Sequence, residues 1–372
     1  MKKINIFTFT VGRSDFGILQ NLLIRLKKNK RFNSNLVVNE VHKSKIFGDT
    51  SKEIKNIYYD KLHIVRYKLT SNDINFNISQ IIKSYNNFFK KNKIDACIIL
   101  GDRYEMMSIS IVIKKFLIPI FHLHGGAETL GSLDNIYRYT ISKMADVHFV
   151  ETNKHKKNLI KMNIKKNIFV VGAPSLENSE KNLTSKKKFQ TDMNIEFNPL
   201  KKIIISCFHS ETILNLNENL TNLKNLLIFL KSLKQNIVIT YPNADHNFKS
   251  YIDQIEKYRK EKNFFIFKNL GRIKYFSLLN FGNLLIGNSS SGIIETANFK
   301  IPCLNLGNRQ KNRFHNQNVM HSKFDLLEMK KKYKILTANK FYKKISNIKD
   351  LYYKPNTSKK IADKIFQLLF KN

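Results

Sequence analysis

Short apolar runs alternate along this chain with longer stretches whose apolar residues recur every three or four positions. The runs are apolar on both faces, which is typical of parallel strands buried between two layers of helices. The longer stretches have the length and period of amphipathic helices. In the first half we expect strands over residues 4–11, 36–41, 96–100, 118–123, 147–150 and 168–171. We expect helices between them over residues 18–28, 74–91, 104–116, 133–144 and 154–162.

The alternation stops at residues 179–198, which are polar, charged and without a clear period. This stretch is interpreted as a connection between domains. Strands are predicted again at residues 202–208, 237–241, 264–267, 284–287 and 301–306. Helices are predicted to begin near Asn219, His246, Ile273 and Ser290, and the chain is predicted helical from about Ser322, ending in residues 361–370.

This order of elements predicts an α/β protein with two Rossmann-like, doubly wound domains that face a cleft. We expect the first domain at residues 1–180 and the second at residues 181–355. The remaining residues, 356–372, form a C-terminal helix that we expect to pack back on the first domain. In this fold class, ligands bind at the carboxyl ends of the strands.

The composition is that of a folded protein, with 42% hydrophobic and 12% aromatic residues. No apolar run approaches the roughly 18 residues that a membrane-spanning helix needs. The first seven residues resemble the start of a signal peptide, but the polar residues 12–15 follow and no small-residue cleavage site does. A buried first strand is therefore expected. Three scattered cysteines lack metal-type or disulfide spacing, which favours a cytoplasmic location.

The formal net charge of +37 raises the alternative of a nucleic-acid-binding protein. However, the lysines are spread along the whole chain beside many asparagines and isoleucines, which is typical of an AT-rich genome. The lysine-rich runs at residues 154–157 and 186–188 lack interleaved aromatic residues. We therefore expect no nucleic-acid partner and no membrane partner. The positive field would still attract polyanionic substrates.

Residues 287–295 combine the end of a predicted strand, three serines and the start of a predicted helix. Amide groups at such a turn attract anions, and serine hydroxyls add donors. Ser289, Ser290 and Ser291 are candidate phosphate-binding residues, Gly292 would allow close backbone approach, and Glu295 would accept from ribose hydroxyls. An ordinary serine N-cap is the alternative interpretation.

The stretch after the first predicted strand, residues 12–17, has glycines at both ends and carries Arg13. An arginine at this place can form a forked contact with a phosphate. A capped turn, with Asp15 near the helix start, is the alternative interpretation.

The predicted strand over residues 96–100 is followed by Asp102 and Arg103. Asp102 is placed either for catalysis or to cap the next helix. In the following loop, His122 and His124 would point to the same face if Leu123 is in a strand, and a metal site is a minor alternative.

Further polar residues follow the later strands of both domains. Asp134 and Arg138 are four residues apart on a predicted helix, so they share a face and are able to pair. His209 and Asn243 follow two strands of the second domain. Both are candidates for binding or chemistry, with a purely structural histidine as the alternative.

These motifs, in this order, resemble the hydrolysing UDP-N-acetylglucosamine 2-epimerases of the sialic-acid and legionaminic-acid branch. The resemblance extends from about Ile4 to Arg313. Its stretches are residues 12–17, 101–105, 122–126, 131–143, 171–174, 241–245, 287–295 and 306–311. It implies the glycosyltransferase-B arrangement, a UDP-sugar substrate, and neither a metal nor a redox cofactor. The implied reaction eliminates UDP to a 2-acetamidoglucal and then hydrates it to the free manno-configured sugar.

The resemblance also implies roles for individual residues. It places the uracil and ribose near residues 270–273 and Glu295, and the diphosphate at Ser289 and Ser290. Arg13, His209 and Arg309 would assist at the diphosphate, while Asp102 and Asp134 would act as acids or bases.

This chain departs from the family pattern around the sugar. It has Ala127 where many members have an acid, and Glu128 follows one position later. His124 stands where some members have an acid, and Tyr139 and Asn135 replace a histidine and a second acid. The C2 base therefore remains open among these groups, and a 2,4-diacetamido-trideoxy sugar or a GDP-sugar is an alternative substrate.

Two other enzymes on this fold are alternatives, a non-hydrolysing 2-epimerase and a glycosyltransferase. Release of free UDP without an acceptor distinguishes the hydrolysing epimerase from both. We expect the enzyme to be a homodimer or homotetramer.

Overall fold

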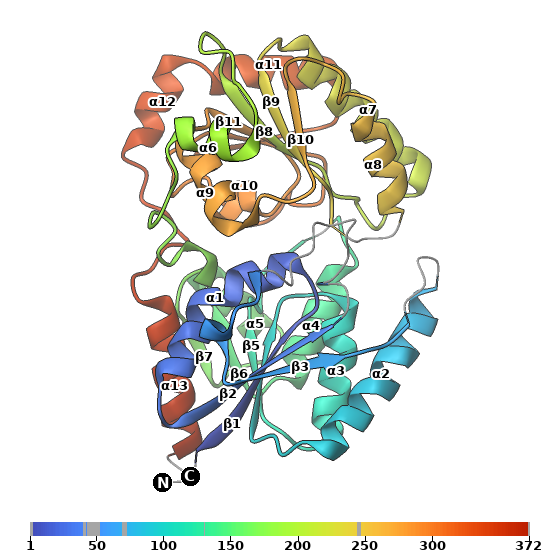
Figure 1. Ribbon diagram of the computed structural model, residues 1–372, viewed down its shortest axis with the longest axis vertical. Coiled ribbons are helices and arrows are strands. Elements are labelled where there is room, and N and C mark those ends of the chain that lie inside the picture. Colours follow the sequence, from blue (N-terminus) through green and yellow to red (C-terminus); the bar gives the residue numbers. More distant parts are fainter. Residues whose placement is uncertain are drawn as a thin grey trace. The chain divides into compact units, whose positions relative to one another are not determined.

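The computed structural model describes residues 3–39, 42, 53–68, 73–129, 131–243 and 247–370, with the backbone alone for residues 13 and 14. The chain forms two compact units (Figure 1). Unit 1 comprises residues 1–127, 134–178 and 352–372, and unit 2 comprises residues 128–133 and 179–351. Among the described residues, no helix is long and apolar enough to cross a membrane.

Unit 1 is built on a parallel sheet of seven described strands in the order β3-β2-β1-β4-β5-β6-β7. The strands are β1 (Ile4–Thr10), β2 (Phe32–Asn39), β3 (Lys61–Val65), β4 (Ala96–Leu100), β5 (Ile120–Leu123), β6 (Val147–Val150) and β7 (Ile168–Val170). The helices are α1 (Arg13–Lys28), α2 (Ile74–Lys91), α3 (Tyr104–Lys115), α4 (Asp134–Met144), α5 (Asn153–Lys161) and α13 (Thr357–Phe370), with short 3-10 turns at Asn56–Tyr58 and Pro174–Leu176.

Successive residues of each strand in this sheet face opposite helical layers. On β4, Ile98 packs in the core that α1 and α13 cover, whereas Cys97 and Ile99 pack in the core that α2 and α3 cover. Side chains of a strand point alternately to its two faces, so a strand covered on both sides must be apolar throughout. This requirement explains the uninterrupted apolar runs of the sequence.

Unit 2 repeats the design with six described strands in the order β10-β9-β8-β11-β12-β13. The strands are β8 (Ile203–Cys207), β9 (Asn236–Thr240), β10 (Phe264–Phe267), β11 (Leu284–Gly287), β12 (Cys303–Leu306) and β13 (Val319–Ser322). The helices are α6 (Lys186–Met193), α7 (Leu216–Ser232), α8 (Phe248–Glu256), α9 (Gly271–Phe281), α10 (Ser291–Ile294), α11 (Leu326–Leu336) and α12 (Asn339–Ser346). Its main core lies between the sheet and α7, α8 and α11.

The chain enters unit 2 briefly between β5 and α4. Residues 128–133 group with unit 2, although the residues on both sides of them belong to unit 1. Thr212 of unit 2 anchors the segment, because its hydroxyl accepts from the backbone N–H of Leu133 at 2.9 Å and lies 3.2 Å from the hydroxyl of Ser132. The predicted division near residue 180 contains no such exchange.

Apart from the two 3-10 turns, three elements were not predicted from the sequence pattern. β3 and β13 are edge strands. The exposed Lys61 and the partly exposed His63 interrupt the apolar run of β3, and the partly exposed His321 interrupts that of β13. The third is α6, which lies in the stretch interpreted as a connection. Ser185 caps α6 and Phe189 anchors it, packing on Phe281 of α9 with 5.3 Å between ring centroids. The predicted helix start at His246 lies outside the described residues, and α8 begins at Phe248.

Candidate functional site

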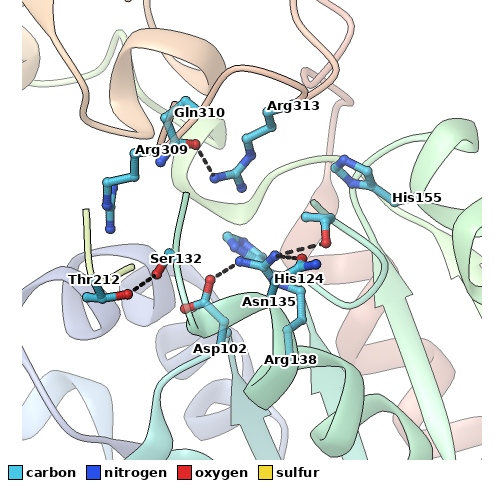
Figure 2. A network of polar contacts seen from close by, with 12 residues as sticks. Asp102, His124, Ser132, Asn135, Arg138, His155, Thr212, Arg309, Gln310 and Arg313 are labelled. Atoms are coloured by element: carbon cyan, nitrogen blue, oxygen red, sulfur yellow. Dashed lines mark hydrogen bonds and ion pairs between the residues drawn. The ribbon is translucent and has the colours of Figure 1, made fainter. Parts of the chain in front are cut away.

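Asp102 and Arg138 form an ion pair in unit 1 (Figure 2). Asp102 follows β4 at the carboxyl edge of the sheet, and Arg138 lies one turn into α4 with its side chain 1% exposed. Arg138 also donates to the carbonyl of Ala127 at 2.8 Å. The sequence suggested that Arg138 is able to pair with Asp134, and the structure gives Arg138 an ion pair with Asp102. The carboxylate of Asp102 is thereby held in one orientation at the strand end.

Arg103 and Asp134 lie beside this pair along the chain. The guanidinium of Arg103 forks onto the carboxylate of Glu105 at 3.1 and 3.2 Å, and Arg103 itself is the N-cap residue of α3. Asp102 therefore does not serve as the N-cap of α3. Asp134 is the first residue of α4, where a carboxylate is favoured by the partial positive charge of the helix start.

The two histidines of the β5 loop have different surroundings. His122 lies in β5 and is fully buried, with Nε2 2.9 Å from the carbonyl oxygen of Gly101 and Nδ1 3.2 Å from the hydroxyl of Ser142. His124 follows the strand with a left-handed φ of 67° and lies 3.4 Å from Glu151. His122 is therefore held as a structural residue. Within the described residues, no group of three histidine, cysteine or acidic side chains is arranged to hold a metal ion.

Burial lowers the pKa of His122 from its ordinary 6.5 to about 3, with smaller effects from the Gly101 hydrogen bond and from His148 and His124. The unfolded chain takes up a proton on His122 below about pH 6.5, whereas the folded chain does not until about pH 3. We therefore expect the free energy of unfolding to fall as the pH is lowered between these values, by about 1.4 kcal/mol per pH unit for this group.

Urea unfolding at intervals between pH 7 and pH 4 measures this slope. In the His122→Asn variant, the slope of the unfolding free energy against pH should be smaller by about 1.4 kcal/mol per pH unit, the value for one proton. An equal slope in the variant and the wild type would contradict the assignment, even if the variant is less stable at every pH.

Glu128 belongs to the segment of residues 128–133, which groups with unit 2. Its side chain is half-buried, and the preceding Ala127 is fully buried. Gly131 of the same segment fits against the backbone of Arg309, where an added Cβ would come within 2.7 Å. The segment therefore approaches the loop that carries Arg309.

Asn288 joins His209 and Arg309 in unit 2. Its buried side chain accepts from the backbone N–H of His209 at 2.7 Å and donates to the carbonyl of His209 at 2.8 Å. Its own carbonyl accepts from the guanidinium of Arg309 at 3.3 Å. β8 and β11 are neighbours in the sheet, so the residues that follow them meet. Asn288 was not among the predicted site residues.

The imidazole of His209 is held by two further contacts. Its Nδ1 accepts from the backbone N–H of Asn243 at 3.3 Å, and its Nε2 lies 3.3 Å from the sulfur of Cys207. An Nδ1 that accepts a hydrogen bond leaves the proton on Nε2 when the ring is neutral. The backbone of Asn243 thus sets the tautomer of His209.

The serine-rich turn is organised by its own side chains. Ser291 donates to Glu295 at 2.5 Å and lies 2.6 Å from the hydroxyl of Tyr275. Burial raises the pKa of Tyr275, and the charge of Glu295 adds to the effect. Ser289 accepts from the backbone N–H of Ser291 at 3.3 Å, whereas the side chain of Ser290, the N-cap of α10, makes no capping bond in the described structure. Ser290 is thus the N-cap of α10 by position, but without the side-chain bond of an ordinary serine N-cap.

Two glycines of this region are required by close packing. At Gly287, with φ +154°, an added Cβ would come within 2.2 Å of the Cys207 carbonyl oxygen. At Gly292 it would come within 2.6 Å of the sulfur of Cys303 in β12. The close approach predicted at Gly292 is thus found toward the neighbouring strand.

Glu211 holds the loop that carries Arg309. Its buried carboxylate accepts from the backbone N–H of Asn308 at 2.8 Å. Burial raises the pKa of Glu211, while the N–H groups of Asn308 and Arg309 and the charge of Arg309 act in the opposite direction. An added Cβ at Gly307, with φ +68°, would come within 2.1 Å of this carboxylate. The sequence carried no local signal for this role of Glu211.

The two units thus offer different chemistry. Unit 2 brings together His209, Arg309 and serine hydroxyls, which suit an anionic ligand. Unit 1 carries Asp102 and His124 after neighbouring strands, groups that are able to accept and donate protons. The side chain of Arg13 lies outside the described residues.

Residues 24–366 match the family described as UDP-N-acetylglucosamine 2-epimerase. A protein of Campylobacter jejuni named GDP/UDP-N,N'-diacetylbacillosamine 2-epimerase (hydrolyzing) is 32% identical over 334 residues, which cover 88% of this chain and 86% of that protein. A Legionella pneumophila protein named UDP-N,N'-diacetylbacillosamine 2-epimerase (hydrolyzing) is 30% identical over 84% of this chain and 83% of its own length.

A crystal structure of UDP-GlcNAc 2-epimerase from Neisseria meningitidis, bound to UDP-GlcNAc, superposes with a TM-score of 0.82. It is 16% identical, and the match covers 98% of this chain and all of that one. This likeness confirms the predicted fold class, two Rossmann-like units of the glycosyltransferase-B type.

Proposed function

Because the chain belongs to the UDP-N-acetylglucosamine 2-epimerase family, we propose that this enzyme is a hydrolysing nucleotide-sugar 2-epimerase. Its substrate is UDP-N-acetylglucosamine or a 4-acetamido-6-deoxy derivative of it. The products are the free manno-configured N-acetyl sugar and UDP. The relatives named as hydrolysing enzymes support water as the second substrate.

The observation that carries this proposal is the contact set of Asn288, which holds His209 and Arg309 at the serine-rich turn. In the elimination, the C1–O bond breaks and its electron pair leaves with UDP. The C2–H bond breaks as well, and its electron pair forms the C1–C2 double bond. Positive groups at the diphosphate stabilise the charge that develops on the leaving group.

The proton from C2 needs a base, and the subsequent hydration needs a second acid–base group. Water adds its oxygen to C1, while a proton adds to C2 from the face opposite to the one it left. Asp102, Asp134, Glu128 and His124 are the candidates for these steps. Arg103, Asn243, Ser289, Ser291, Gly292, Glu295 and Arg13 are the proposed binding residues beside Ser290 and Arg309.

We further propose that the enzyme needs no metal or redox cofactor, acts in the cytoplasm as a homodimer or homotetramer, and takes neither nucleic acid nor membrane as a partner. A product of this configuration suits the synthesis of sialic or legionaminic acids for a surface polysaccharide. An E. coli relative, 28% identical over 96% of this chain, is named polysialic acid biosynthesis protein P7.

The test is incubation with a panel of UDP- and GDP-sugars in D2O, followed by NMR of the products. We expect UDP and a free manno-configured sugar that carries deuterium at C2, because hydration delivers a solvent proton to that carbon. A manno-configured sugar still attached to its nucleotide would indicate the non-hydrolysing reaction. Unchanged substrate across the whole panel would overturn the proposal.

A further inference from the structure

A buried carboxylate in unit 1 lies between two histidines. Glu151 directly follows β6 and is fully buried. One of its oxygens lies 3.4 Å from Nε2 of His124, and the other lies 3.1 Å from Nδ1 of His155. His155 lies on α5, one turn further along the chain, and is 1% exposed. The three side chains form a cluster around the carboxylate of Glu151.

Electrostatics ties the protonation states of this cluster together. An ionised carboxylate is expensive to bury unless a positive charge lies beside it. An imidazolium at His124 supplies that charge, so Glu151 favours the protonated form of this ring. His124 and His155 thus contact the same carboxylate. Replacing one of these histidines changes how strongly Glu151 acts on the other.

His124 is the member of the cluster that reaches solvent. Its side chain is 10% exposed, whereas that of Glu151 is completely buried. Its backbone adopts the left-handed conformation, with φ 67°, which is uncommon for a residue other than glycine. Such conformations concentrate at functional sites, where the surrounding structure maintains them.

His122 and the Arg138–Asp102 pair also belong to this part of unit 1. His122 precedes on β5 and stays neutral, because burial lowers its pKa to about 3. The Arg138–Asp102 pair, drawn in the same view as His124 in Figure 2, combines one charge of each sign. Glu151 lies at ion-pair distance from His124, so its negative charge favours the protonated form of this ring.

We propose that Glu151 is a positioning residue that keeps a proton on Nε2 of His124 and leaves Nδ1 as the basic nitrogen. This inference rests on the proposed function. The lone pair of Nδ1 takes a proton either from C2 in the elimination or from the attacking water in the hydration, and the electron pair of the broken bond stays with the substrate or the water oxygen. Glu151 balances the resulting imidazolium, which then releases its proton to solvent. His155 shares the charge of Glu151 and so moderates the basicity of His124.

The test uses the full chain with 15N-labelled histidines and needs no substrate. The His124 signal is assigned by its loss in His124→Asn. The pH at the midpoint of the His124 titration is then measured by NMR. In Glu151→Gln the midpoint should fall by about 1–3 pH units, the effect of a carboxylate at this distance. In His155→Phe it should rise, because Glu151 then has one imidazole to balance.

The opposite shifts of the His124 midpoint distinguish electrostatic positioning from a structural role. A structural role would shift this midpoint in the same direction in both variants. Phenylalanine preserves the ring contact of His155 with Tyr352, whose centroids are 5.8 Å apart. Glu256→Gln, a change in unit 2, is the control and should leave His124 unmoved. An unmoved midpoint in Glu151→Gln, or a shift of the same sign in both variants, would overturn the inference.

Kinetics supplies a second readout. In Glu151→Gln, kcat should fall about tenfold or more. The apparent pKa in the pH dependence of kcat should shift to lower pH by the same amount as the His124 titration midpoint measured by NMR. Glu151→Asp should restore part of kcat, and the affinity for UDP should stay unchanged in both. If the wild type releases UDP and Glu151→Gln has the same kcat at every pH, the inference is wrong. A wild type that releases no UDP would instead refute the proposed function, and the NMR result would still stand.

Discussion

Asp102→Asn is expected to slow the release of UDP by about 10²–10⁴-fold, the usual contribution of one acid–base group. Asparagine has the size of aspartate and still accepts a hydrogen bond from Arg138, but it neither takes a proton nor carries charge. The affinity for UDP should change little, because the proposed diphosphate residues belong to unit 2. Steady-state kinetics and calorimetry with UDP measure the two quantities.

Asp146→Asn is the matched control for this variant. Asp146 is also an aspartate of unit 1 paired with a cation, Lys114, but it precedes β6 and so lies at the amino end of that strand. Its turnover should stay within about twofold of the wild type. Full activity in Asp102→Asn would remove Asp102 from the mechanism. A parallel loss of UDP binding and thermal stability would show instead that Arg138, left without its carboxylate, disturbs the fold.

The double variant Ser290→Ala with Arg309→Ala is expected to weaken UDP binding by about 10²–10³-fold. Hydrogen bonds to charged groups contribute about 1.5–3 kcal/mol and neutral ones about 1 kcal/mol, and each 1.4 kcal/mol corresponds to about tenfold in Kd. The side chain of Ser290 makes no capping bond to α10 in the described structure, so its hydroxyl is not committed to the helix. Calorimetry with UDP measures the change.

Lys311→Ala is the control, since it removes an exposed cation from the same loop. It should reduce UDP affinity by no more than about threefold. Uridine, which lacks the diphosphate, should lose far less affinity than UDP in the double variant. Equal losses for uridine and UDP, or an unchanged Kd for UDP, would contradict the assignment of the diphosphate site.

Most of the fold was predictable because a strand that is buried on both faces of a parallel sheet forms a continuous apolar run in the sequence. The ranges predicted for α2, β4, β10 and β11 agree with the observed bounds at every residue. β3 and β13 were missed because polar residues interrupt their apolar runs, whereas the edge strands β7 and β10 have uninterrupted apolar runs and were predicted. The short α6 was missed because only Phe189 of it is buried.

The candidate site divides in the same way. The residues that follow strands were predictable, since the ends of apolar runs are local features. Asp102, His124, His209 and residues 287–295 were placed there correctly. Their partners were decided by tertiary structure alone. Arg138 is 36 positions from Asp102, and Asn288 is 79 positions from His209.

These partners meet because of strand order, which no local pattern encodes. β11 lies beside β8 although β9 and β10 come between them along the chain, and this crossing brings Asn288 to His209. Likewise, the pairing of β5 with β6 brings His124 to Glu151. Local burial therefore specified the strands and the residues at their ends. The packing of the strands, which depends on the whole chain, determined which of those residues act together.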